Sequence, residues 1–232
     1  MTERLVLWDF DGTLAFRPGL WSGCVIEVLD EHVPTHSITV EHIRTRLRDG
    51  FPWHRSDHPH PYPGDPERWW EPIQRLIANA LVDVGVSDAR CAEIADAVHR
   101  RFIDPSIGWT LFDDALPALS ATAAAGWTNA ILSNHVPELP ALVAGLGLDT
   151  HVDRVFTSAL IGYEKPNPEI FRHALSAYEH PRETWMVGDN PIADVAGAEA
   201  AGLRAVLVRS ASADPPGQAV GLRQASEIIL AG

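Results

Sequence analysis

Five short apolar runs, each ending in polar residues, constrain the fold of this chain more than any other feature. The runs occupy residues 5–11, 128–134, 153–158, 184–190 and 204–209. Between them, the stretches 116–125, 138–146, 168–178 and 192–201 carry apolar residues at helical spacing, and Gly126, Gly147 and Gly202 are suitable helix stops. Strands that alternate with helices predict an α/β fold with a parallel sheet of about five strands.

The segment 16–111 has a different pattern. It contains helical stretches at 21–31, 40–48, 66–84 and 88–102, with no convincing strand between them. We therefore expect an α/β core formed by residues 1–15 and 112–232, and an inserted helical cap formed by residues 16–111. Trp69 and Trp70 are interpreted as core residues of a cap helix.

Prolines and histidines are concentrated in the middle of this insert. Residues that precede proline are driven towards extended conformations, so the sequence from Phe51 predicts a long ordered loop. His54, His58 and His60 lie in this loop, and three histidines can suggest a metal site. No second group of ligands flanks them, and we interpret them as solvated or packing residues.

Composition narrows the class of partner and the compartment. The formal net charge is −13 and no run of lysine or arginine offsets it, which disfavours nucleic acid as a partner. No stretch approaches the roughly 18 apolar residues of a membrane span, and the first apolar run is too short for a signal peptide. Cys24 and Cys91 have no CxxC spacing, so we expect reduced thiols and a cytoplasmic protein.

The first apolar run ends in two carboxylates. Asp9 and Asp11 stand within the sequence DFDGTL, where the chain would leave the sheet. The carboxyl ends of parallel strands share one edge, and ligands of open α/β sheets bind there. Asp-Gly is also a common turn signal, so this hexapeptide becomes informative only in combination with later strand ends.

Later strand ends add the groups that such a site needs. The second run ends in Ser133 and Asn134, and the third is followed by a proline-stiffened loop around Lys165. Lys165 is the single lysine among 18 basic residues, which indicates a position that requires a compact ammonium group. The fourth run ends at Asp189, and Asp194 follows in the next helical turn. Together these groups predict a hard-cation site opposite a phosphate site.

The order of these motifs resembles the four motifs of the haloacid dehalogenase (HAD) superfamily. DFDGTL, the strand-end serine, the Lys-Pro loop and GDNPIAD follow one another between positions 9 and 194, and no motif position is missing. The helical insert looks like the class 1 cap of that superfamily, and GYEKPNPEIF is similar to the corresponding sequence of its small-molecule phosphatase branch. The resemblance implies a Rossmann-like core and a phosphatase of small phosphorylated metabolites.

The resemblance also assigns roles in the reaction. Asp9 would be the nucleophile that becomes phosphorylated, because a carboxylate is already ionised at neutral pH. Asp11 would be the general acid and base. Mg²⁺ would be bound by Asp9, by the backbone carbonyl of Asp11 and by Asp189.

Five further residues would support these groups. Ser133, the amide of Asn134 and Lys165 would bind the phosphoryl oxygens. Asp194 would orient Lys165 or metal-bound water, with Asn190 supporting the same site from beside it.

Several alternatives stay open at this point. A 2-haloacid dehalogenase has the same fold and the same first carboxylate, but dehalogenases lack the second aspartate, here Asp11. A phosphomutase would pass the same phosphoryl group to another hydroxyl. An inactive module that binds a phosphorylated ligand would be suggested by loss of Asp9, Lys165 or Asp189, and all three are present.

Substrate choice and oligomeric state depend on parts of the chain outside these motifs. Substrate choice in this superfamily depends on cap residues, for which the candidates are Arg17, Trp21, Arg48, Trp53 and His54. A monomer and a homodimer are equally compatible with the chain.

Overall fold

A five-stranded parallel sheet forms the centre of the computed structural model, which describes residues 3–179, 181–209 and 221–232. The strand order is β5 (Arg154–Thr157), β4 (Thr128–Ser133), β1 (Arg4–Trp8), β6 (Glu183–Gly188) and β7 (Arg204–Leu207). Each predicted strand is present, and the parallel α/β fold is confirmed. β1 lies between β4 and β6, pairing Leu7 with Ala130 on one side and with Met186 on the other.

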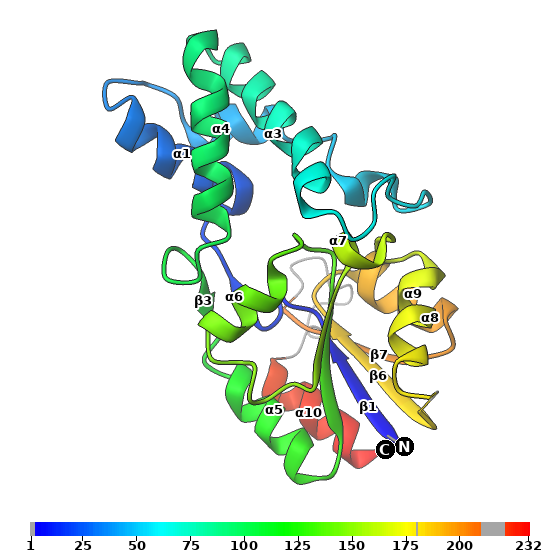
Figure 1. Cartoon of the computed structure of the whole chain (residues 1–232). Helices are drawn as coiled ribbons and strands as arrows, with labels where there is room; N and C mark the ends of the chain where they lie inside the picture. The colour runs from blue at the N-terminus through cyan, green and yellow to red at the C-terminus, as the bar shows by residue number, and fades with distance from the viewer. Residues whose placement is uncertain (1–2, 180, 210–220) are drawn as a thin grey trace.

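Alternate residues of each strand point to opposite faces of the sheet, and both faces are covered by helices. Leu5 and Leu7 pack into a cluster with α8 (Pro168–Ser176) and α9 (Gly197–Ala200). Val6 and Trp8 join the cluster that contains α5 (Ala115–Ala124) and α10 (Leu222–Ala231). Figure 1 shows these two pairs of helices on opposite sides of the sheet.

Three more elements of the α/β core connect one strand to the next along the chain. They are α6 (Leu139–Gly145), α7 (Ser158–Ile161) and the π-helix η2 (Pro191–Ala196). The predicted helix at 192–201 is therefore divided, because η2 precedes α9. The sequence patterns did not predict α10, and the predicted core also includes residues 210–220, which lie outside the described residues.

The inserted segment is helical where it is described. Its helices are α1 (Leu20–His32), α2 (Val40–Arg46), α3 (Pro66–Asp83) and α4 (Asp88–Phe102), with the short 3₁₀ helix η1 (Pro52–Arg55) between α2 and α3. In Figure 1 these helices stand above the carboxyl ends of the strands. Trp69 and Trp70 are buried in α3, as expected for helix-core residues.

A small antiparallel pair of strands, absent from the sequence prediction, joins the insert to the sheet. β2 (Ala15–Phe16) pairs with β3 (Thr110–Leu111), so that Ala15 lies opposite Leu111. Two-residue strands leave too short a pattern to be recognised. The pair brings together the two chain segments at which the cap was expected to begin and end, although the exact domain boundaries stay a prediction.

Among the described residues, every helix is too short or too polar to cross a bilayer.

Candidate active site

Three neighbouring strands deliver polar side chains to one edge of the sheet. Asp9 follows β1, Ser133 ends β4 and Asp189 follows β6. Because β1 is the middle strand of the three, these side chains enter a common cavity of about 540 Å³. Asp11, Asn134, Lys165, Asn190 and Asp194 also line this cavity, so every site residue expected from the sequence lies there. The individual roles of these residues remain predictions.

A tight turn after β1 shapes the acidic end of this cavity. The carbonyl of Phe10 accepts hydrogen bonds from the backbone N–H groups of Leu14 and Ala15, both at 2.9 Å. Gly12 has φ = +80°, and a Cβ atom there would lie 2.6 Å from Oδ2 of Asp189. Glycine therefore permits both the left-handed turn and the close approach of the Asp189 carboxylate.

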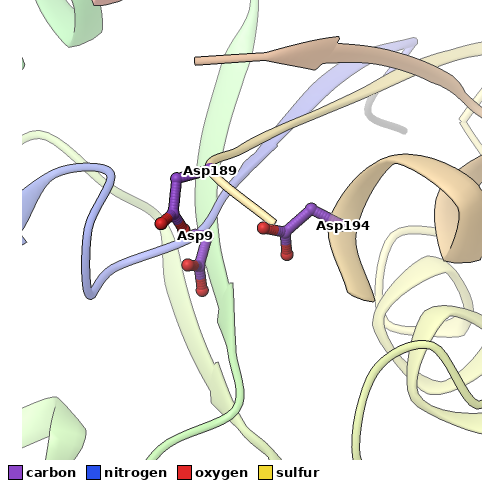
Figure 2. Close-up of side chains that lie close together, drawn as sticks. All are labelled: Asp9, Asp189 and Asp194. Atoms are coloured by element: carbon purple, nitrogen blue, oxygen red, sulfur yellow. The ribbon is translucent and has the colours of Figure 1, made fainter. Parts of the chain in front are cut away.

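Asp9, Asp189 and Asp194 form a compact acidic cluster. One carboxylate oxygen from each lies within 4.8 Å of the others. Figure 2 shows the Asp9 and Asp189 side chains close together, with Asp194 extending towards them from beyond β6. Burial raises the pKa of Asp189 to about 7, and repulsion from Asp9 and Asp194 contributes to the increase. The cluster is therefore short of positive charge.

Lys165 is the cation within this cluster. Its side chain is 2% exposed, and its Nζ donates to Asp9 Oδ1 at 2.8 Å and to Asp194 Oδ1 at 2.6 Å. The carbonyl of Leu132 accepts a third hydrogen bond at 2.8 Å. Burial alone would lower the pKa of Lys165, but Asp194 and Asp9 outweigh burial and raise it. Lys165 is thus a charged group that fixes the position of Asp9.

The backbone of the Lys165 loop is fixed by an unexpected partner. The Asn134 side chain accepts from Lys165 N at 2.6 Å and donates to Lys165 O at 2.9 Å. We expected only the backbone amide of Asn134 to act, in binding phosphate. Nothing in the sequence signals this pair of bonds, because the partners are 31 residues apart.

Asp194 is oriented on its other side by the turn that follows β6. Its Oδ2 accepts from the backbone N–H of Asn190 at 2.9 Å. The Asn190 side chain in turn accepts from Ile192 N and Ala193 N, both at 3.0 Å, and so caps η2. Burial raises the pKa of Asp194, while the Lys165 ammonium opposes this effect. Since both Asp194 oxygens already accept hydrogen bonds, Asp9 and Asp189 are better placed to bind a cation.

The composition of the site fits a divalent metal ion with a preference for oxygen ligands. Asp9, Asp11, Asp189 and Asp194 line the cavity, and among the described residues Lys165 is the one lysine or arginine that lines it with them. Carboxylate oxygens are the ligands that Mg²⁺ favours. A bound cation would supply the positive charge that the raised pKa of Asp189 shows to be lacking.

Asp11 lies beside this cluster in the same cavity. Burial raises the pKa of its carboxyl group well above the ordinary value, and repulsion from Asp9 and then from Asp189 raises it further. A carboxyl group with a raised pKa holds its proton more strongly and is suited to donate it to a leaving group.

The cap contributes a largely aromatic wall to the cavity. Trp21, Trp53, His54 and Phe102 all line it. Trp21 stacks on Phe102 with 3.9 Å between ring centroids. Of the five candidate specificity residues, Arg17 and Arg48 instead line a neighbouring cavity of about 470 Å³.

The histidines of the cap loop do not form a metal site in the described part of the chain. His60 is buried, and its Nε2 lies 2.9 Å from Oε1 of Glu164 in the Lys165 loop. His58 is exposed and pairs with Asp57. The interpretation of these histidines as solvated and packing residues is consistent with this arrangement.

His135 is a residue of the cavity that the sequence analysis missed. It follows Ser133 and Asn134 directly and is 4% exposed. Its ring packs against Phe10 and Trp109, and within the described residues neither ring nitrogen has a hydrogen-bond partner. Burial lowers the pKa of His135 to about 3, so the imidazole is neutral.

Known proteins share both the sequence and the fold. The family model of haloacid dehalogenase-like hydrolases matches residues 3–202. The chain is 38% identical over 143 residues to a phosphoserine phosphatase of Thermus thermophilus, a match that covers 60% of this chain and 56% of that protein. It is 30% identical over 226 residues to haloacid dehalogenase-like hydrolase domain-containing protein 3 of Mus musculus, covering 94% and 85% respectively.

Two solved structures are similar over almost the whole chain. The 2-haloacid dehalogenase of Pseudomonas syringae has 27% identity and a TM-score of 0.66, with 99% of this chain and 98% of that chain covered. The HAD-hydrolase YfnB of Bacillus subtilis has a TM-score of 0.74 with 99% of both chains covered, and at 18% identity it shows the fold alone. With the match to residues 3–202, these findings establish that the chain belongs to the haloacid dehalogenase-like hydrolases.

Proposed function

We propose that this hydrolase is a Mg²⁺-dependent phosphatase, which removes the phosphoryl group from a small phosphorylated metabolite through an aspartyl phosphate on Asp9. The observation that carries the proposal is that one cavity holds two carboxyl groups, Asp9 and Asp11, in different electrostatic surroundings. Asp9 is held by the Lys165 ammonium, whereas burial and repulsion raise the pKa of Asp11. One group is suited to attack and the other to transfer a proton.

In the first step, a carboxylate oxygen of Asp9 attacks phosphorus in line with the ester oxygen. The new bond joins Asp9 to phosphorus, while the bond between phosphorus and the ester oxygen breaks. Asp11 donates its proton to that oxygen, so the product leaves as a neutral alcohol. Lys165 holds Asp9 in position for attack through its 2.8 Å bond to Oδ1.

In the second step, water replaces Asp9 on phosphorus. Asp11 is now ionised and accepts a proton from the attacking water, whose oxygen forms the new bond to phosphorus. The bond between phosphorus and Asp9 breaks, which releases inorganic phosphate and restores both carboxyl groups. Ser133 and the backbone amide of Asn134 would bind the phosphoryl oxygens from the end of β4.

Mg²⁺ would be held by Asp9, Asp189 and the backbone carbonyl of Asp11. When bound, it would neutralise negative charge on the carboxylates and on the phosphoryl group. The excess of carboxylates over cations in the cavity supports this assignment.

Dehalogenation is the second candidate, because a 2-haloacid dehalogenase is among the similar solved structures. That reaction also begins with attack by the first aspartate, but on carbon. Asp11 favours the phosphatase, since a halide leaves without needing a proton from a general acid.

The decisive experiment measures phosphate release from p-nitrophenyl phosphate with Mg²⁺ and with EDTA, beside halide release from 2-chloropropionate. We expect Mg²⁺-dependent phosphate release and no halide release. Asp9→Asn should fold and lose phosphate release, because an amide is not a nucleophile. Halide release by the wild type, or turnover of the phosphate ester by Asp9→Asn, would refute the proposal.

A further inference from the structure

The cavity has two unlike ends. Its core end carries the carboxylates and Lys165, where a phosphoryl group would react. Its cap end is bounded by a mainly apolar wall made of Leu20, Trp21, Trp53 and Phe102, beside which His54 and Ser56 add uncharged or weakly basic polar groups. The part of a substrate that leaves after phosphoryl transfer would therefore lie against this wall.

The wall offers no cation that could pair with a negative charge on the substrate besides its phosphate. Among the residues that the structure describes, Lys165 is the one lysine or arginine lining the cavity, and three protein oxygens already accept hydrogen bonds from its ammonium group. Arg17 is buried, bonds to Glu27 and donates to the carbonyl of Ile107 at 2.6 Å. Its charge is therefore satisfied inside the cap.

Two more arginines lie near the wall but on another surface. Arg44 and Arg48 line the neighbouring cavity, which shares Leu20, Trp21, Trp53 and His54 with the active-site cavity. Neither arginine lines the cavity that holds the carboxylates. Arg44 also pairs with Glu41 at 2.7 Å.

The two histidines of the cavity do not replace the missing cation. His54 Nδ1 accepts a hydrogen bond from the backbone N–H of Phe51 at 3.3 Å. The Asp49 carboxylate also faces this ring, with its Oδ1 3.4 Å from Nδ1, so the His54 side chain is already engaged by groups of the cap. His135 is buried among aromatic rings and is neutral.

We infer that the substrate is a phosphate monoester whose leaving group is uncharged and apolar, with an aromatic or similarly flat ring that packs against Trp53. This inference rests on the proposed phosphatase function. A carboxylate at the same position would lose its hydration without gaining a cationic partner, whereas a flat apolar group would exchange water for aromatic contacts. Trp53 is half-buried and stacks on Phe51 at 4.5 Å, so it is a preformed surface for a ring.

The first test compares benzyl phosphate with phosphoglycolate and phosphoserine. All three release an alkyl alcohol, so the comparison is not governed by an unusually good leaving group. We expect kcat/KM for benzyl phosphate to exceed that of either carboxylated ester by about tenfold or more, given the cost of an unpaired buried charge. Equal or faster turnover of a carboxylated ester would overturn the inference.

Two variants test whether the wall is responsible for the preference for an apolar leaving group. Trp53→Ala should lower the ratio of kcat/KM for benzyl phosphate to that for ethyl phosphate by about tenfold. Leu20→Arg should raise kcat/KM for phosphoglycolate relative to benzyl phosphate, because it supplies the missing cation without emptying the aromatic cluster. Tyr62→Ala is the matched control, since this exposed ring contacts Arg68 outside the active-site cavity. An unchanged ratio in Trp53→Ala, with a wild-type melting temperature, would contradict the assignment.

Binding of phosphonates separates this inference from the proposed function. 2-Phenylethylphosphonate and 3-phosphonopropionate replace the ester oxygen by carbon and cannot be hydrolysed. Calorimetric titration in Mg²⁺ should show about tenfold tighter binding of the phenyl compound. Tighter binding of 3-phosphonopropionate would refute the inference while leaving the phosphatase proposal intact. If neither compound bound and no ester were hydrolysed, both proposals would fall.

Discussion

At the scale of single residues, Lys165 combines a charge with a demanding geometry. Its ammonium group donates to Asp9, Asp194 and the Leu132 carbonyl. These acceptors belong to three different elements, because Asp9 follows β1, Asp194 lies in η2 and Leu132 lies in β4. A tetrahedral ammonium can direct three hydrogen bonds in this way, whereas a guanidinium is planar and broader. The requirement for lysine at this position is therefore geometric as well as electrostatic.

We expect Lys165→Arg to lower kcat by roughly 10²–10³-fold, because misplacement of Asp9 by about 1 Å is sufficient for such a loss. Lys165→Ala should be similarly inactive and should also melt at a lower temperature, since it leaves Asp194 buried without its cation. Steady-state kinetics and thermal melts of both variants provide the measurement. Retention of most activity by Lys165→Arg would show that the position needs only a positive charge.

Asp11 offers a second test at this scale. Asp11→Asn removes the proton donor but keeps the backbone carbonyl, so Mg²⁺ binding should persist. Rates should fall by about 10²–10⁴-fold for alkyl phosphates, whose leaving groups need a proton, and much less for p-nitrophenyl phosphate. Comparison of the two substrate types in one variant checks this. Equal losses would exclude Asp11 as the general acid.

Sequence patterns predicted where the reacting groups lie but not how they are held. Asp9, Ser133 and Asp189 lie at the carboxyl ends of predicted strands, and parallel strands place these ends at one edge. The two hydrogen bonds between the Asn134 side chain and the Lys165 backbone join two loops that meet only after folding. His135 carried no signal either, because a buried neutral histidine and a surface histidine look alike in a sequence.

At the scale of secondary-structure elements, the cap loop is attached to the Lys165 loop by hydrogen bonds. The N–H of His60 donates to the carbonyl of Gly162 at 2.7 Å, and the side chain of Asn167 donates to the carbonyl of Ser56 at 2.9 Å. This loop also contains Trp53. Its attachment therefore sets the position of the cavity wall over the catalytic residues.

The two side-chain hydrogen bonds of Asn167 can be separated by substitution. Its Oδ1 caps α8 by accepting from Glu169 N, and its Nδ2 donates to Ser56. Asn167→Asp keeps an acceptor for the cap but cannot donate. We expect faster amide hydrogen exchange in residues 51–62 and unchanged exchange at the start of α8. Asn167→Ala, which removes both bonds, should accelerate exchange at both places. Unchanged exchange in the loop of both variants would show that Ser56 does not anchor it.

Long elements were predicted better than short ones for a physical reason. The central strands and the four main cap helices repeat their apolar pattern over several residues, and burial on both faces of the sheet makes the strand signal nearly continuous. β2 and β3 consist of two residues each and depend on their partner across the pair. The segment 192–201 is divided into η2 and α9, and within η2 Asp194 packs against Gly188, where an added Cβ would lie 2.1 Å from Asp194 Oδ2.

At the scale of the whole molecule, the acidic cavity couples folding to pH and to metal binding. The chain has a formal net charge of −13, and the cluster of Asp9, Asp189 and Asp194 concentrates part of it around a single lysine. In the metal-free fold the pKa of Asp189 is about 7, above the value of about 4 for an unfolded chain. Between these values the folded state binds more protons than the unfolded state, so this residue's contribution to stability decreases as pH rises from about 4 to 7.

Mg²⁺ should reverse this loss, because it binds the ionised carboxylate and only the folded state assembles the site. We therefore expect the melting temperature to rise on replacing EDTA with Mg²⁺, by more at pH 8 than at pH 6, where Asp189 is largely protonated. The measurement is a thermal melt in each of the four conditions. The quantity to compare is the rise in melting temperature on adding Mg²⁺ at each pH. Groups that do not contact the metal contribute equally with and without Mg²⁺, so their effect cancels in this difference.

Asp189→Asn is the control for this last prediction. Without metal it should melt above the wild type at pH 8, since it removes one of the mutually repelling carboxylates. Its response to Mg²⁺ should be small and nearly equal at both pH values, because the titrating ligand is gone. An equal Mg²⁺ increment in the wild type at pH 6 and pH 8 would mean that Asp189 is not the group whose ionisation limits binding. A full increment in Asp189→Asn would place the metal on other ligands of the cavity.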